Sequence, residues 1–116
     1  EVKTAGNLSV FVPEKWTLVP GTAGGIEDDN SLFLKESEDS TEYLWVQIQD
    51  KDSVKSSLDL NTEKDIEPIT LDGVEWTGKV NMITAEKDGT VFLVAQYGYD
   101  FNDSLVQYIL KSVKKA

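Results

Sequence analysis

The sequence predicts an α+β fold, a mainly antiparallel β-sheet of about six or seven strands with a C-terminal helix packed on it. Several short segments alternate apolar and polar residues, which is typical of half-buried strands. Two Asp-Gly pairs, at 72–73 and 88–89, indicate tight hairpin turns. The last segment instead carries its apolar residues at helical spacing. A chain of 116 residues has the length of one domain, so we expect 1–116 to form a single domain.

The first third of the chain predicts three strands with a loop between the second and the third. Residues 7–12 and 16–19 are short apolar stretches, each stopped by a proline. Residues 21–30 hold three glycines and three acidic residues, a composition typical of a loop. A third strand is expected over 31–36, followed by a polar turn over 37–41.

The clearest alternation lies in residues 42–50. Its aliphatic side chains, which we expect to point into the core, are Leu44, Val46 and Ile48. The opposite face carries two aromatic and two amide side chains: Tyr43, Trp45, Gln47 and Gln49. Such a row suits sugar stacking or protein docking, because rings offer contact area and amides offer directional hydrogen bonds. The alternative is that a helix on the second face of the sheet covers Trp45.

The second half predicts a strand meander. Residues 67–71 lead into the first hairpin turn, 74–84 form a long strand, and 90–99 return beside it. The segment 90–99 is apolar on both sides, which predicts an interior strand covered on each face. Tyr97 and Tyr99 share one side of that strand, and we expect their hydroxyl groups at the rim of the core.

Two helices are predicted. Asp52 or Ser53 is suited to cap a short helix within the ambiguous segment 51–68. A second helix over 104–114 has one apolar stripe that must dock on the sheet, with Asn102 as its expected N-cap. We interpret the acidic residues near both helix starts as caps rather than metal ligands.

Composition excludes several classes of function. The chain has 21 acidic residues against 11 lysines, a net charge of -10, and no arginine, histidine or cysteine. Zinc, haem, iron–sulfur and thiol sites therefore lack their ligands, and neither a histidine-dependent catalytic triad nor a disulfide can form. We expect no cofactor and no resident metal. The charge disfavours nucleic acid and anionic membrane surfaces, and no apolar run is long enough for membrane insertion.

Catalysis by carboxylates alone remains compatible with this composition. Glycoside hydrolysis needs only two carboxylates at a fixed separation. The acidic residues fall mostly in turns and polar stretches, however, where no pocket would raise the pKa of a catalytic carboxyl group. We therefore expect no enzymatic activity.

Three motifs follow the order found in one family of domains. An early strand runs into a Pro-x-x-Trp motif at 13–16, an Asp-Gly hairpin follows at 72–73, and an Ile-Leu-x-Ser-x-Lys pattern over 109–114 ends the chain. This order resembles PsbP-like domains, which share their fold with the DcrB-like bacterial lipoproteins. The resemblance implies an antiparallel sheet flanked by helices and a non-catalytic role in a secreted or lipid-anchored protein. It places Trp45 beneath a helix, which is the interpretation we favour. The polar segment 51–68 departs from the family's crossover helix.

A second candidate surface is acidic. Residues 27–42 hold seven acidic residues against one lysine, a local charge of -6. The residues considered as a partner surface are Glu27, Asp28, Asp29, Glu36, Glu38 and Asp39, together with Tyr43 and Trp45. Such charge would attract a basic protein, and its oxygens would suit calcium, although the spacing of an EF-hand loop is missing. We favour a solvated, charged surface over both of these functions.

Together these patterns predict a non-catalytic binding or accessory domain of unknown ligand. We expect it to lie outside the cytoplasm, secreted or lipid-anchored, and to act as a monomer through contacts with a protein partner. The alternative is an acidic inhibitor or immunity-type protein that binds a basic protein partner.

Overall fold

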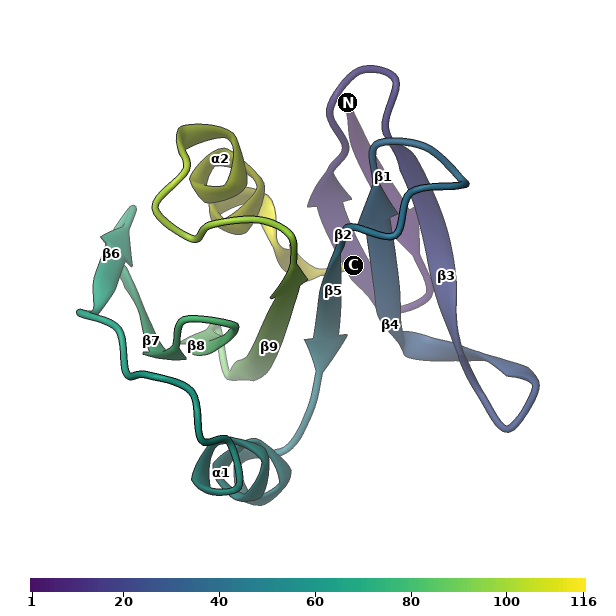
Figure 1. Ribbon diagram of the computed structural model, residues 1–116. Coiled ribbons are helices and arrows are strands. Elements are labelled where there is room, and N and C mark those ends of the chain that lie inside the picture. Colours follow the sequence, from purple (N-terminus) through teal and green to yellow (C-terminus); the bar gives the residue numbers. More distant parts are fainter.

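A sheet of seven antiparallel strands runs through the computed structural model, which describes residues 1–116 (Figure 1). Its strands, in their order across the sheet, are β3 (Thr17–Ala23), β4 (Ile26–Lys35), β5 (Tyr43–Ile48), β9 (Thr90–Tyr97), β8 (Met82–Lys87), β7 (Val74–Lys79) and β6 (Ile69–Leu71). A smaller sheet has β2 (Leu8–Phe11) between β1 (Val2–Ala5) and β10 (Lys114–Lys115). The predicted mainly antiparallel sheet is therefore confirmed.

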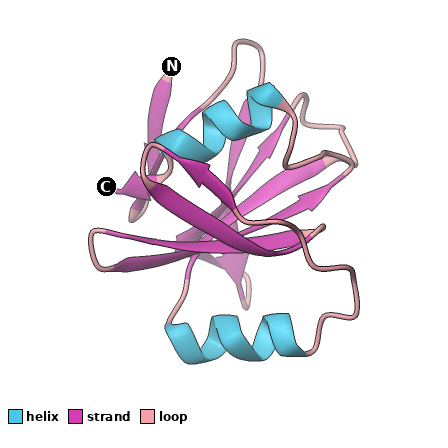
Figure 2. Cartoon of the chain, turned by 90° about the vertical axis from the view of Figure 1, so that its left-hand side faces the viewer, coloured by secondary structure: helices cyan, strands magenta, loops and turns pink.

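The two helices lie on opposite sides of the larger sheet (Figures 1 and 2). Three apolar residues of α2 (Ser104–Ser112) are fully buried: Val106, Ile109 and Leu110. On the other side, α1 (Lys51–Asp59) buries Val54, and an ion pair of 3.3 Å joins Lys51 to Glu86 of β8. The C-terminal helix thus packs on the sheet as predicted.

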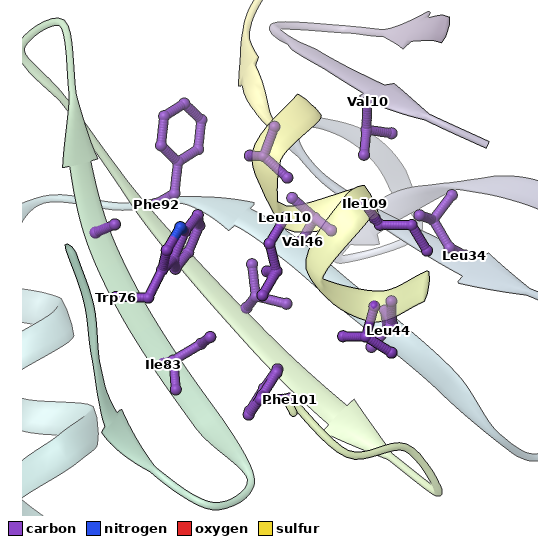
Figure 3. Packing of buried hydrophobic residues seen from close by; sticks show 14 of the residues in the cluster. Val10, Leu34, Leu44, Val46, Trp76, Ile83, Phe92, Phe101, Ile109 and Leu110 are labelled. Carbon is purple, nitrogen blue, oxygen red and sulfur yellow. The ribbon is translucent and has the colours of Figure 1, made fainter. Parts of the chain in front are cut away.

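The hydrophobic core lies between the inner face of the larger sheet, α2 and β2 (Figure 3). Alternate residues of each strand point into it, because successive side chains in a strand face opposite sides. The largest fully buried side chains are Trp76 and Phe92, which pack with aliphatic residues from β2, β4, β5 and α2. Burial of one such aliphatic side chain contributes about 1.5–3 kcal/mol. The inner face is therefore used for folding.

The predictions for the two central strands are confirmed. Leu44 and Val46 are fully buried, so β5 directs its aliphatic face into the core. β9 lies between β5 and β8, and its residues 92–95 are all buried. Asp72 and Asp88 adopt positive φ angles of 49° and 50°, as tight Asp-Gly hairpins require.

The segment 21–30 is not a loop, contrary to the prediction. β3 and β4 continue through it as an antiparallel hairpin (Figure 1), whose residues 21–29 we call the hairpin arm. A register shift between Pro20 and Gly21 marks where the arm leaves the rest of the two strands. Main-chain pairing holds the arm together, and such pairing does not require an apolar sequence.

The predicted strand over 74–84 is two strands instead of one. β7 and β8 are joined by a tight turn at Val80 and Asn81, which leaves Val80 40% exposed. No Asp-Gly pair or proline marks this turn, so the sequence pattern does not reveal it.

Both helices begin at a different cap from the predicted one. Asp50 caps α1, instead of Asp52 or Ser53, and its carboxylate accepts a hydrogen bond of 2.8 Å from the Ser53 backbone N–H. Asp103 caps α2, instead of Asn102, and accepts hydrogen bonds from two backbone N–H groups of the first turn. The interpretation of aspartates near the helix starts as caps is confirmed.

The end of α2 also differs from the prediction. The helix ends at Ser112 rather than at Lys114, and the chain continues as β10 beside β2. The Nζ of Lys87 donates hydrogen bonds to the carbonyls of Lys111 and Val113 at this end. The sequence pattern predicts neither β1 nor β10, because both are short, mostly exposed strands whose pairing with β2 decides their conformation.

Candidate binding surface

Four aromatic side chains from three neighbouring strands form a row on the outer face of the larger sheet. We call this row the aromatic strip: Phe33 of β4, Tyr43 and Trp45 of β5, and Tyr97 of β9. Ring centroids lie 4.6 Å apart between Tyr43 and Tyr97, 5.2 Å between Tyr43 and Phe33, and 5.4 Å between Phe33 and Trp45. These separations are typical of favourable aromatic pairs, so the four rings support one another as a unit.

Strand register brings the strip together. Phe33 pairs with Trp45 across β4 and β5, and Tyr43 pairs with Tyr97 across β5 and β9. Because paired residues of adjacent strands point to the same face, all four rings lie opposite the core. Tyr43 and Trp45 are predicted site residues, whereas Phe33 and Tyr97 are not. Only the pairing of β4 and β9 with β5 reveals them, and the sequence does not specify that pairing.

Tyr97 and Tyr99 do not share a face, contrary to the prediction. Gly98 between them has a φ angle of 92°, a left-handed conformation that interrupts the alternation of the strand. Tyr97 is 49% exposed, whereas Tyr99 packs against the core and donates a hydroxyl hydrogen bond of 3.1 Å to Glu36. The predicted place at the rim of the core is therefore right for Tyr99 and wrong for Tyr97.

Trp45 is half-buried, and α1 does not cover it in the way that we expected. α1 lies on the same side of the sheet, but Val54 and Leu58 face a groove that they share with β7, β8 and the start of β9. The indole Nε1 of Trp45 is buried and has no hydrogen-bond partner. The helix therefore lies over another part of the outer face, and within the strip Phe33, Tyr43 and Trp45 are half-buried while Tyr97 is exposed.

The acidic residues form two groups instead of one surface. Glu27, Asp28 and Asp29 lie on the hairpin arm, at the start of β4. The others lie between β4 and β5, and we call them the turn acids: Glu36, Glu38, Asp39 and Glu42. The two groups lie at opposite ends of β4 (Figure 1). Only the turn acids adjoin the aromatic strip.

The turn acids are all exposed and follow the strip along the chain between β4 and β5, and Glu36 and Glu42 lie beside Tyr99. Lys35 contributes the one positive charge here, with its Nζ 6.0 Å from the ring centroid of Tyr43. Burial raises the pKa of Tyr99 to about 12, helped by its hydrogen bond to Glu36 and by the negative charge of Glu36 and Glu42. Burial and the neighbouring Tyr97 also raise the pKa of Tyr43. Both phenols therefore stay neutral hydrogen-bond donors at physiological pH.

The hairpin arm is fixed at its base. Asp28 accepts hydrogen bonds from a backbone N–H at 2.9 Å and from the Ser31 hydroxyl at 3.0 Å. Gly21 lies so close to Ser31 that an added Cβ would be 1.8 Å from the hydroxyl oxygen. The Asn7 backbone N–H donates a bond of 2.8 Å to the Asp29 carbonyl. Asp28 therefore serves the fold, and Glu27 and Asp29 carry the accessible charge of the arm.

A polar cleft of about 780 Å³ lies beside the start of α1. Lys51 pairs with Glu86 there, and Asp50 is engaged as the helix cap, so Lys115 is the one charged side chain of the cleft without an ion pair or hydrogen bond. No three acidic side chains come together anywhere in the fold in a way that could hold a metal ion. The aromatic strip with its turn acids is therefore the stronger candidate site.

Comparison with protein-family models, with curated proteins and with solved structures finds no match for this chain. Neither helix has the length and apolar character needed to cross a membrane. Function is therefore inferred from the aromatic strip and the turn acids themselves.

Proposed function

We propose that this chain is a non-catalytic binding domain that acts outside the cytoplasm through contact with a basic protein partner. The observation that carries the proposal is the aromatic strip, which lies on the outer face of the sheet and ends at the turn acids. Aromatic residues are enriched in the centres of protein interfaces, where they supply large contact area at little entropic cost.

The strip favours a protein over a sugar as its ligand. Phe33 and Trp45 stack with an interplanar angle of 15°, so one face of each ring is covered by the other ring and cannot stack on a sugar. Gln47 is 6% exposed and accepts a hydrogen bond from the side chain of Gln49. A sugar needs a free ring face with free hydrogen-bonding groups beside it, whereas a protein can pack against ring edges.

The charge around the strip selects a basic partner. Beside the strip, the chain has four turn acids and one lysine, Lys35, and the whole chain carries a net charge of -10. Charges at the rim of an interface act mainly on the rate of encounter and on the choice of partner, while the aromatic centre supplies most of the affinity.

Affinity capture with matched variants tests this proposal. Three proteins are immobilised: the unchanged chain, Tyr97→Ser and Leu60→Ser. Tyr97→Ser removes an exposed ring of the strip. Leu60→Ser is the control, because it changes a side chain that is 83% exposed at the end of α1. We expect Tyr97→Ser to weaken binding of the captured protein by about tenfold or more, and Leu60→Ser to leave it unchanged. We also expect binding to weaken as salt rises, because charges at the rim of the interface are screened.

Equal binding by all three proteins would contradict the proposal, as would binding that does not change with salt. A glycan array provides the second arm. If the unchanged chain binds a sugar on the array and Tyr97→Ser does not, the ligand of the strip is a carbohydrate rather than a protein.

A second candidate function is an inhibitor or immunity-type protein, which the hairpin arm favours. Ile26 near its tip is 74% exposed, Glu27 and Asp29 are exposed beside it, and Asp28 fixes the base. A rigid projection with an apolar tip and acidic sides suits an apolar pocket bordered by basic residues. If this function is correct, Ile26→Ser weakens capture and Tyr97→Ser does not.

We further propose that the chain is a PsbP-like domain of a secreted or lipid-anchored bacterial protein. An antiparallel sheet with a helix on each side supports this relationship, and so does the Pro-x-x-Trp segment that leads into β3. The sequence of the full gene tests the location. A signal peptide, or one that ends in a lipid-attachment cysteine, would support it, and a cytosolic protein recovered by cell fractionation would contradict it.

A further inference from the structure

The outer edge of β3 carries backbone groups without partners. β3 pairs with β4 on one side, and no strand lies beside it on the other. None of the backbone hydrogen bonds outside the strand ladders involves residues 17–23. The opposite edge strand, β6, has 3 residues, whereas β3 has 7. β3 is therefore the longer template for an additional strand.

β3 also lacks the charge that commonly protects a sheet edge. Thr17–Ala23 contains no charged residue, although edge strands of natural proteins are often blunted by lysine. Pro20 has no N–H to donate, and the register shift at Gly21 bends the edge. Pro20 and the register shift therefore limit continuous pairing with an added strand to Thr17–Val19. They also disfavour the addition of many further strands. This edge thus suits one short added segment.

The edge borders the aromatic strip and has acidic residues near both ends. Val19 pairs with Phe33, so an added strand would extend the outer face directly beside the strip. At one end of β3, Thr17 pairs with Lys35, whose single positive charge is outnumbered by the four turn acids that follow it. At the other end, Ala23 pairs with the residue that precedes Glu27. A segment with an apolar middle and positive ends matches this pattern of charge.

We propose that a basic, extended segment of the protein partner adds to β3 as a further strand of the larger sheet. Its apolar middle lies beside Val19 and Phe33, and its lysine or arginine residues lie at the two acidic ends. The inference rests on the proposed function and specifies how the partner binds. Main-chain hydrogen bonds supply affinity in this mode, and alternate side chains supply specificity.

A second copy of this chain is a poor occupant of the edge. Each copy carries a net charge of -10, and two β3 strands paired about a two-fold axis would bring the acidic ends of one copy against those of the other. The distribution of charge therefore favours a basic segment from a different protein.

The test uses three synthetic peptides and the isotope-labelled chain at low salt. The first peptide alternates valine and threonine between paired lysines, the second is the same peptide N-methylated at alternate residues, and the third has glutamate in place of lysine. We expect the first to bind saturably and to slow amide hydrogen exchange within Thr17–Val19. We expect the other two to bind about tenfold or more weakly, because one lacks main-chain donors and the other has the wrong charge.

Equal binding of the N-methylated peptide would overturn strand addition, because charge alone would then account for binding. Failure of the first peptide to bind, or protection centred on β6 instead of β3, would also overturn it. None of these results would contradict the proposed function, because that function is tested separately by the weaker binding of the captured protein to Tyr97→Ser.

Discussion

Gly98 places two neighbouring tyrosines in different surroundings. Tyr97 reaches the outer face of the sheet, while Tyr99 turns to the core and bonds to Glu36. Burial is the main cause that raises the pKa of Tyr99 to about 12, and the hydrogen bond and charge of Glu36 add to it. A tyrosine in an unfolded chain ionises near pH 10, so the folded protein holds this proton more tightly.

The raised pKa of Tyr99 makes stability depend on pH in the alkaline range. Between pH 10 and about 12 the folded protein keeps a proton on Tyr99 that the unfolded chain has lost. The contribution of Tyr99 to the free energy of unfolding is therefore fully present below pH 10 and is lost as the pH rises through about 12. We expect the free energy of unfolding, measured by urea titration, to fall less over this range in Tyr99→Phe than in the unchanged chain. Identical pH dependence in the two proteins would contradict the assignment.

Asp28 and Asp29 are neighbours in the sequence with different roles in the hairpin arm. The carboxylate of Asp28 accepts two hydrogen bonds, whereas that of Asp29 is exposed. We expect Asp28→Ala to lower the free energy of unfolding by about 1–2 kcal/mol, because it leaves the Ser31 hydroxyl and a backbone N–H without their acceptor. Asp29→Ala should change it by less than about 0.5 kcal/mol. Chemical denaturation compares the two, and equal losses would show that Asp28 does not fix the arm.

At the scale of secondary-structure elements, α2 depends on a residue from a distant hairpin. Lys87 lies at the end of β8, and its Nζ satisfies the carbonyls of Lys111 and Val113 where the helix ends. Burial lowers the pKa of Lys87, because the ammonium group is less hydrated where it meets the helix end. The last carbonyls of a helix have no partners within the helix, so a distant donor can define its end.

Replacement of Lys87 tests this role. We expect Lys87→Met to lower the free energy of unfolding by about 1–2 kcal/mol, because two backbone carbonyls lose their donor while the apolar stem is retained. Lys111→Met is the matched control, since it removes a lysine from the same helix end and should cost less than about 1 kcal/mol. Thermal unfolding followed by circular dichroism compares them. A smaller loss for Lys87→Met than for Lys111→Met would contradict the role.

The sequence predicts those elements whose signal is local. β5 and β9 show strand periodicity, α2 shows helical periodicity, and the Asp-Gly pairs mark their own turns. The hairpin arm, β1 and β10 depend on hydrogen bonds between residues distant in sequence, which no local pattern contains. The same distinction divides the site. Alternation within one strand gives Tyr43 and Trp45, whereas Phe33 and Tyr97 join them only through cross-strand register.

At the scale of the whole molecule, the charge remains largely unneutralised. The chain has 21 acidic residues against 11 lysines, and the ion pairs formed are those of Lys51, Lys55 and Lys79. The folded state therefore holds like charges closer together than the unfolded chain does, which opposes folding at low ionic strength.

Added salt should stabilise this protein. Sodium chloride at about 0.5 M reduces the Debye length to a few ångströms and screens the repulsion between acidic groups. We expect the melting temperature to rise between low salt and 0.5 M, and to rise less in Glu38→Lys, which reverses one exposed charge among the turn acids. A melting temperature that falls with salt would show that attractive ion pairs outweigh the repulsion.

The outer face of the sheet carries both α1 and the aromatic strip. α1 and its groove occupy the part over β7 and β8, and the aromatic strip occupies the part over β4, β5 and β9. The central claim is that the strip, bordered by the turn acids, contacts a basic protein.

Indole resonances in a proton–nitrogen correlation spectrum test that claim most directly. The chain has three tryptophans, of which Trp45 lies in the strip and Trp76 is 1% exposed in the core. We predict that addition of the purified captured protein shifts or broadens the Trp45 indole signal, together with the amides of Phe33, Tyr43 and Tyr97, and leaves the Trp76 signal unchanged. An unchanged Trp45 signal in a saturated complex, with shifts centred on α2 or on the polar cleft instead, would contradict it.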